Sequence, residues 1–171
     1  EKYGADTVRL FILFAANPTA GMDWSDSALE ANYRQMVQLY GMPSNILEWN
    51  GGASEIDLWM QARLKQRCLQ WQNAMDNYDL RGAVDASHFD LVKDLNWYRR
   101  RGGENPEVGK EILNVWTHMI SIATPHLAED WWKMQGNTDL MAGRVFDLPG
   151  ELSEEEVAAL EAESYLRSFL E

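Results

Sequence analysis

The sequence predicts an all-α protein, an antiparallel helix bundle that follows an N-terminal linking elbow. Apolar residues recur every three or four positions along several stretches, which is the spacing of one buried helix face. Glycine, proline and helix-capping residues separate these stretches, and the short connections favour antiparallel neighbours. With 171 residues, 46% of them hydrophobic and eight of them tryptophan, the chain can fill a single core.

The elbow is predicted over residues 1–26. Its apolar run from Val8 to Ala16 is interrupted at Asn17-Pro18, because the residue before a proline disfavours the helical conformation. A short extended piece near the elbow is the one candidate strand in the sequence. Ser27 and Glu30 have the spacing of a capping box, so the first helix of the bundle is predicted to begin at Ser27.

Apolar stripes define the helices of the predicted bundle. They are Leu29, Tyr33, Met36, Val37 and Tyr40; Met60, Leu64, Cys68, Trp71, Met75 and Tyr78; Leu80, Val84, His88, Leu91, Leu95 and Tyr98; and Val108, Ile112, Val115, Trp116, Met119 and Ile122. The first stripe is predicted to end at Gly41 and Pro43, the second at Asn77–Asp79 and the third at Gly102-Gly103. Further helix starts are predicted at Asn105-Pro106, at Thr124-Pro125 and at the capping box of Ser153 and Glu156.

Charge is distributed unevenly along the chain. The net charge of −12 argues against nucleic acid, because RNA and DNA binding is driven by lysine and arginine. Residues 151–171, predicted to form an acidic helix, hold seven acids and one arginine, a balance of −6. Residues 63–103 hold eight bases and five aspartates, a balance of +3. The position of the charge matters more than its total, and a basic band remains in the middle of the chain.

The basic band contains the candidate RNA-binding residues. They are Arg63, Arg67, Lys93, Trp97, Arg99, Arg100 and Arg101. Arg63 and Arg67 lie four residues apart on one helix edge, a row that suits the phosphates of an RNA stem. Trp97 beside three arginines has the composition of a site that stacks an unpaired base. Three alternatives stay open: an ordinary solvated face for the row, a core position for Trp97 and a charged helix end for the arginine triplet.

The sequence predicts no catalytic, cofactor-binding or metal site within the chain. His88, His118 and His126 lack the spacing of a zinc-binding helix, Cys68 is the single cysteine, and a glycine-rich phosphate loop is absent. The apolar runs are too short to cross a membrane and no signal peptide is visible, which favours a cytoplasmic protein. The start at Glu1 instead of methionine indicates a piece of a longer protein.

Four parts of the chain resemble class I aminoacyl-tRNA synthetases. The opening segment, with Tyr3-Gly4-Ala5-Asp6, Phe14-Ala15-Ala16-Asn17-Pro18 and Asp23-Trp24-Ser25-Asp26-Ser27, is similar to the segment that follows the KMSKS loop, and is most like leucyl-tRNA synthetases of the archaeal and eukaryotic type. The other three resembling segments, in the family's order, are Leu95–Arg101, Trp116–Trp131 and Glu163–Arg167. The resemblance therefore covers nearly the whole chain.

Two positions depart from the pattern of the family. Ile122 stands where the family usually has proline, and Arg34–Gln38 lacks a further basic residue, which argues against RNA contact by the first bundle helix. Asp6 and Arg9 are expected to form an ion pair that holds the shape of the elbow, in preference to contacting RNA. Neither Ile122 nor the missing basic residue in Arg34–Gln38 changes the predicted fold.

The resemblance implies a layout and a function. Residues 1–26 would link to the catalytic domain of the same polypeptide, residues 27–150 would form the anticodon-binding helical bundle, and residues 151–171 would lead toward a C-terminal domain. The full-length enzyme would join leucine to tRNA(Leu) using ATP and Mg²⁺, while this piece carries no catalytic site. Neither DNA nor a membrane is an expected partner. The alternatives are the same domain of an isoleucyl-, valyl- or methionyl-tRNA synthetase, and an acidic helical protein-interaction module that uses a tryptophan-rich face or the acidic tail.

Overall fold

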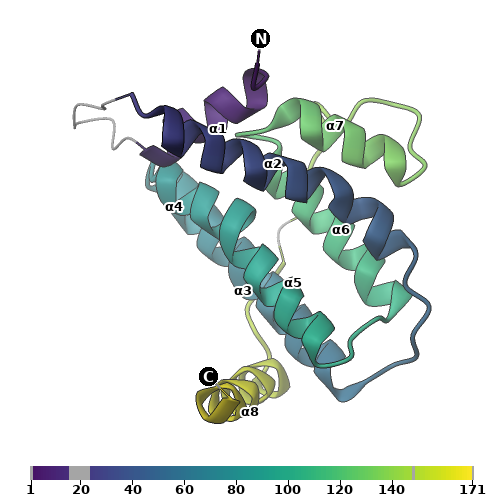
Figure 1. Cartoon of the computed structure of the whole chain (residues 1–171). Coiled ribbons are helices and arrows are strands. Elements are labelled where there is room, and N and C mark those ends of the chain that lie inside the picture. The colour runs from purple at the N-terminus through teal and green to yellow at the C-terminus, as the bar shows by residue number, and fades with distance from the viewer. Residues whose placement is uncertain (1, 16–23, 148, 171) are drawn as a thin grey trace.

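The computed structural model describes residues 2–15, 24–147 and 149–170, and all regular structure in these ranges is helical (Figure 1). The helices are α1 (Ala5–Ala15), α2 (Asp26–Leu47), α3 (Glu55–Asp76), α4 (Leu80–Val84), the π-helical segment η1 (Asp85–Asp90), α5 (Leu91–Arg100), α6 (Pro106–Ile120), α7 (Pro125–Met134) and α8 (Glu154–Leu170). Consecutive long helices run in opposite directions, which confirms the predicted antiparallel bundle.

Helix α3 lies at the centre of this bundle. It packs against α4, η1, α5, α6 and α8, while α2 packs across α1, α6 and α7. Trp116 and Trp131 are fully buried where α6 meets α7, with their rings edge to face and their centroids 5.1 Å apart. Trp49, Trp59 and Trp97 are also buried, so most of the tryptophans fill the core and do not form an exposed face.

The described part of the elbow contains the helix α1, whereas the sequence had left a short extended piece near the elbow as a candidate strand. Leu10 and Phe11 on α1 are buried, and the helix packs on α2, α4 and α7. The predicted interruption at Asn17-Pro18 lies outside the described residues. The predicted start of the next helix at Ser27 is wrong, because Ser25 is the N-cap and its side chain accepts a hydrogen bond from the Ala28 amide at 3.3 Å. A long-range contact, between the rings of Trp24 and Phe11, fixes where the chain enters α2.

Helix α2 continues past Gly41 and Pro43, where the sequence predicted its end. Pro43 is buried, and the additional turns bring Ile46 and Trp49 into the core. There they lie against Gly109 of α6, where an added Cβ would come within 2.9 Å of Ile46 and 3.0 Å of Trp49. A proline inside a helix costs about 3 kcal/mol, and burying two large apolar side chains at about 1.5–3 kcal/mol each offsets this.

The third predicted helix is continuous but contains a π-helical segment. In η1 the carbonyl oxygens of Ser87 and His88 accept hydrogen bonds from side chains of other helices, the Trp116 indole at 2.6 Å and the Gln35 amide at 2.5 Å. These long-range donors give both carbonyls a partner on another helix. His88 is fully buried on the predicted core face, between the hydroxyls of Ser87 and Thr124.

The remaining predicted boundaries are confirmed. The break at Asn77–Asp79 contains Tyr78 with a φ of 57°. Gly102 ends the arginine-tipped helix with a φ of 85°, and Asn105 caps α6 by accepting from the Glu107 amide at 3.0 Å. Ser153 and Glu156 exchange the two hydrogen bonds of a capping box at the start of α8. These boundaries follow from residues close in sequence.

Buried His88 should make the stability of the protein depend on pH. Burial lowers the pKa of His88 to about 3, whereas in the unfolded chain it is about 6.5. Because the unfolded chain then binds a proton that the folded chain excludes, stability is lost as the pH falls from about 6.5 toward 3, by up to about 1.4 kcal/mol per pH unit. Thermal unfolding between pH 7.5 and 5.5 should show this slope, and His88→Asn should flatten it. His118→Asn, at a partly exposed histidine, is the matched control, and an equally steep slope in His88→Asn would contradict the assignment.

Candidate nucleic-acid interface

Arg63 and Arg67 do form a row on one edge of α3, but their guanidinium groups are engaged by a buried carboxylate. Asp94 of α5 is 1% exposed and accepts from Arg63 Nη2 at 2.8 Å and from Arg67 Nε at 2.7 Å. Arg67 also donates to Asp90 at 2.9 Å. The two arginines therefore join α3 to α5 and present only part of their surface to a ligand.

Two exposed cations of the basic band lie along the outer edge of α5. The side chain of Lys93 is 66% exposed and pairs with Asp90 at 2.9 Å. Arg100 is exposed, with its guanidinium carbon 5.6 Å from the centre of the Trp97 ring. One helix edge thus presents two positive charges, which can approach phosphates with little rearrangement.

The other two arginines of the triplet point to different neighbours. Arg99 pairs with Glu104, donates to the Gly103 carbonyl at 3.1 Å and lies over the ring of Trp49. Arg101 donates through Nε to Glu163 of α8 at 2.8 Å. Helix geometry therefore directs the three consecutive arginines to different neighbours. Arg99 and Arg101 pair with acids, whereas Arg100 lies over the ring of Trp97.

Trp97 lies in the core, which is one of the alternatives that the sequence left open. Its side chain is 4% exposed, and its indole donates to Glu163 at 2.8 Å. The guanidinium carbon of Arg167 lies 5.1 Å from the centre of its ring. A base cannot stack on Trp97 while α8 occupies this position.

A polar junction that the sequence did not predict joins the ends of three helices. Asp57 accepts from the Tyr98 hydroxyl at 2.6 Å, from the Asn105 side chain at 2.7 Å and from the Ser54 amide at 3.0 Å. Burial alone would raise the pKa of Asp57, but the hydrogen bonds from Asn105, Tyr98 and Ser54 outweigh it and lower the pKa. The capping pattern of Ser54 and Asp57 was the available signal. The junction fixes the arginine-tipped end of α5.

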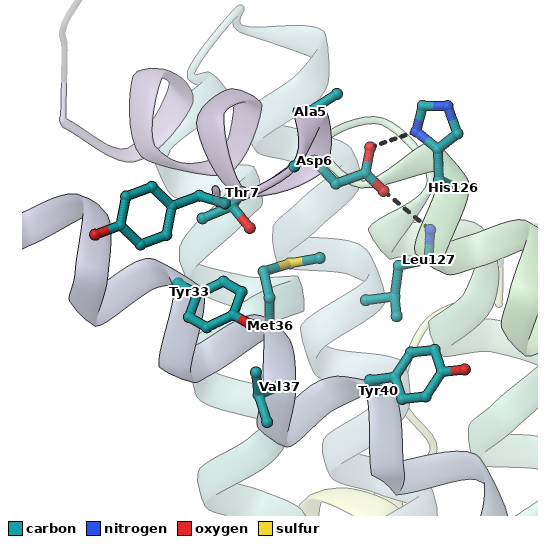
Figure 2. Close-up of a pocket in the computed structure, with 11 residues that line it drawn as sticks. Ala5, Asp6, Thr7, Tyr33, Met36, Val37, Tyr40, His126 and Leu127 are labelled. Atoms are coloured by element: carbon teal, nitrogen blue, oxygen red, sulfur yellow. Dashed lines mark hydrogen bonds and ion pairs between the residues drawn. The ribbon is translucent and has the colours of Figure 1, made fainter. Parts of the chain in front are cut away.

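Asp6 connects the elbow to the bundle (Figure 2). The predicted ion pair with Arg9 is present at 3.2 Å, but Asp6 also accepts from His126 Nδ1 at 2.8 Å and from the Leu127 amide at 2.9 Å. A carboxylate is stabilised at this place because the first turn of α7 has free amide donors. The ion pair was predictable locally, whereas the contact across 120 residues was not.

An apolar groove lies beside this contact, between α1, α2 and α7 (Figure 2). Its volume is about 420 Å³. Tyr33, Val37 and Tyr40 of α2 line it and are exposed, and Leu127 contributes from α7. An aromatic and aliphatic surface of this kind suits a protein or peptide better than a phosphate.

Two chemical features of the described residues concern metal ligands and the single cysteine. Within it, no three histidine, cysteine, aspartate or glutamate side chains are grouped so that they could hold a metal ion. Burial raises the pKa of Cys68 to about 11, so its thiol is neutral at physiological pH and a poor nucleophile. None of the helices within the described ranges combines the length and the apolarity needed to cross a membrane.

The fold has a known counterpart. A leucyl-tRNA synthetase from Agrobacterium radiobacter K84, solved in complex with tRNA and LeuAMS, superposes with a TM-score of 0.70 at 18% identity, over 96% of this chain and 27% of that chain. At this identity the likeness shows the fold alone. Residues 57–168 match the family model described as the anticodon-binding domain of tRNA ligase, and the chain belongs to this family.

The curated relatives agree with the resemblance found in the sequence. A leucine–tRNA ligase from Archaeoglobus fulgidus is 31% identical over 172 residues, which cover 100% of this chain and 18% of that protein. Leucine–tRNA ligases from Methanosarcina acetivorans (32% identical, 98% of this chain, 18% of that protein) and Methanothrix thermoacetophila (35%, 78% and 14%) are also similar. The chain thus spans less than a fifth of the length of these relatives.

Replacing Asp94 should strongly destabilise the fold. Asp94→Asn removes the charge that pairs with Arg63 and Arg67 and leaves two partly buried cations, a change that typically costs about 3–5 kcal/mol. Chemical denaturation measures this loss. Lys93→Ala, which removes an exposed ion pair one residue away, should change stability by about 1 kcal/mol or less. Equal effects of the two substitutions would contradict a structural role for Asp94.

Replacing Asp6 should loosen α1 from α7. Asp6→Ala removes the acceptor of the Leu127 amide and of His126, so we expect a loss of about 1–3 kcal/mol. Hydrogen exchange should show faster exchange in α1 and the first turn of α7. Arg9→Ala removes only the ion pair with Asp6 and should leave the exchange of α1 and α7 unchanged. Faster exchange in this variant would show that the ion pair, not the contact with α7, holds α1 in place.

Proposed function

We propose that the chain is the tRNA-binding helical domain of a leucine–tRNA ligase. The observation that carries this proposal is the 31% identity to a leucine–tRNA ligase over 100% of the chain. The complete enzyme would join leucine to tRNA(Leu) with ATP and Mg²⁺ in the cytoplasm, and its catalytic site would lie outside these residues. The domain's own task would be to hold the tRNA while chemistry occurs elsewhere.

The proposed layout has three parts. Residues 1–26 link the bundle to the catalytic domain of the same polypeptide, residues 27–150 form the tRNA-binding bundle, and residues 151–171 lead toward a further domain. The hydrogen bonds of Asp6 to α7 support a role for the elbow as a joint, since a shift of α1 must move the first turn of α7. Contacts of this kind allow a bound tRNA to influence a neighbouring domain.

The proposed RNA contacts centre on the outer edge of α5. Lys93 and Arg100 would bind phosphates directly, because they are exposed and lie on one side of the helix. Arg99 and Arg101 are half-exposed and would add to the positive field at the end of α5. Arg63 and Arg67 keep unused N–H donors on a guanidinium that is already positioned by Asp94.

Two alternatives to the proposed function differ in the observations that support them. The isoleucyl, valyl and methionyl enzymes are disfavoured, because the relatives described above are leucine ligases. A protein-interaction module is favoured by one observation, the exposed apolar groove lined by Tyr33, Val37 and Tyr40. If that were the main function, Val37→Glu would abolish partner binding while the edge of α5 would be dispensable.

Charge reversal on α5 tests the proposal in the full-length enzyme. Lys93→Glu with Arg100→Glu should weaken tRNA(Leu) binding and reduce the slope of log affinity against log salt by about 1.8, at about 0.9 per lost phosphate contact. Filter binding at several salt concentrations measures both quantities. Arg63 and Arg67 are unsuitable for this test, because reversing them would leave buried Asp94 unpaired.

The matched control reverses one exposed lysine outside the predicted set. Lys110→Glu on α6 adds the same kind of charge change at a site where the lysine pairs with exposed Glu107. It should leave the salt slope unchanged. A loss of slope as large in Lys110→Glu as in a single Lys93→Glu variant would reject α5 as the specific contact surface.

A further inference from the structure

Helix α8 is attached to the bundle mainly by polar contacts. Among its described side chains only Glu163 is buried, at 7% exposure, whereas Leu160 and Ala159 are partly buried. Tyr165 and Phe169 face solvent. In Figure 1, α8 lies at the edge of the bundle against α3 and is seen nearly along its axis. A helix held in this way depends on charge far more than the core helices do.

The charged contacts of α8 involve residues of the basic band. Glu156 accepts from Lys65 of α3 at 2.9 Å. Glu163 accepts both from the Trp97 indole and from Arg101 Nε, each at 2.8 Å. Two carboxylates of the most acidic segment therefore occupy the positions that phosphate oxygens would take on these same donors.

The surface beneath α8 has the composition of a single-stranded RNA site. Trp97 offers a ring on which a base can stack, and Lys65 of α3 and Arg101 at the end of α5 both pair with carboxylates of α8. Next to them, Arg63 and Trp59 line a pocket of about 120 Å³ that α8 closes. Trp97 and Arg101 belong to the combination that the sequence predicted, Lys65 does not, and α8 covers all three contacts.

The connection to α8 allows it to leave without disturbing the core. Residues 137–147 and 149–153 contain no helix or strand. The amides of Met141 and Ala142 donate to Glu129, so the part that can change conformation at low cost is the stretch directly before α8. Phe146 stacks on His118 of α6 with ring centres 4.8 Å apart, and this contact holds the middle of the connection on the bundle. Release of α8 would expose Trp97 while the rest of the chain stays folded.

We propose that α8 masks a second RNA-binding surface, formed by Lys65, Trp97 and Arg101, and that unpaired RNA displaces it. This inference rests on the proposed function, since it names a further surface for the same ligand. Phosphates compete for Lys65 and Arg101, and a base takes the place of α8 over Trp97. The acidic helix thereby excludes weak polyanions and admits RNA that supplies both a phosphate and a base.

Removing the two engaged carboxylates tests the competition in the 171-residue chain. Glu156→Gln with Glu163→Gln frees Lys65 and Arg101, and glutamine retains the capping geometry at residue 156. Affinity for a single-stranded RNA oligonucleotide should rise at least about threefold above the control, with a salt slope steeper by about 1.4, at about 0.7 per added phosphate contact. The control is Glu155→Gln with Glu161→Gln, which removes the same charge from exposed positions of α8.

A second measurement follows α8 directly. Hydrogen exchange of α8 in the unsubstituted chain should accelerate when the oligonucleotide is added, whereas an abasic oligonucleotide of equal charge should have a smaller effect. Trp97→Phe, which presents a smaller ring for stacking, should weaken binding in the freed variant.

The outcomes separate this inference from the proposed function. Equal gains in the two double variants, or unchanged exchange of α8 on RNA binding, would overturn the masking while RNA binding through α5 still stands. If neither the unsubstituted chain nor the freed variant binds RNA, both the masking and the RNA-binding function are rejected.

Discussion

The pairing of buried Asp94 with Arg63 and Arg67 sets the rotation of α5 against α3. A carboxylate at 1% exposure is stable only when opposite charge compensates it, so α5 can adopt one rotation about its axis. At about 100° per residue, that rotation places Lys93 and Arg100 together on one side. It also directs Trp97 and Arg101 toward α8. One buried charge therefore decides which of the basic residues reach solvent.

Most helix boundaries were predictable where the deciding residues are close in sequence, although the cap of α2 is Ser25 and not the predicted Ser27. Asn105 before Pro106, Gly102 after the arginines and Ser153 before Glu156 act on the backbone within one turn, and each boundary follows from such a contact. The end of α2 was not predictable in this way. Gly41 and Pro43 are local stop signals, but the burial of Ile46 and Trp49 against Gly109 outweighs them, and that contact depends on α6.

The sequence predicted which basic residues make up the candidate site, but it did not predict which acidic residues they pair with. The sequence shows that basic residues gather between residues 63 and 103, but their partners are distant: Asp94 lies 31 residues from Arg63, and Glu163 lies 62 residues from Arg101. Periodicity assigns a residue to a helix face without identifying the opposing side chain. For the same reason Trp97 could be placed on α5 from sequence, while its burial under α8 required the packing of the whole chain.

A net charge of −12 is compatible with the proposed RNA binding, because salt screens the carboxylates that lie far from the edge of α5. At physiological salt the field of an exposed charge decays over about 8 Å, so a phosphate at Lys93 or Arg100 senses mainly its immediate neighbours. At lower salt the distant carboxylates are screened less, and their repulsion opposes the gain from counterion release. The acidic surface then slows the approach of any polyanion, whereas the edge of α5 acts only on contact. If the edge of α5 binds RNA as proposed, a ligand that fits this edge is favoured over one that is merely negatively charged.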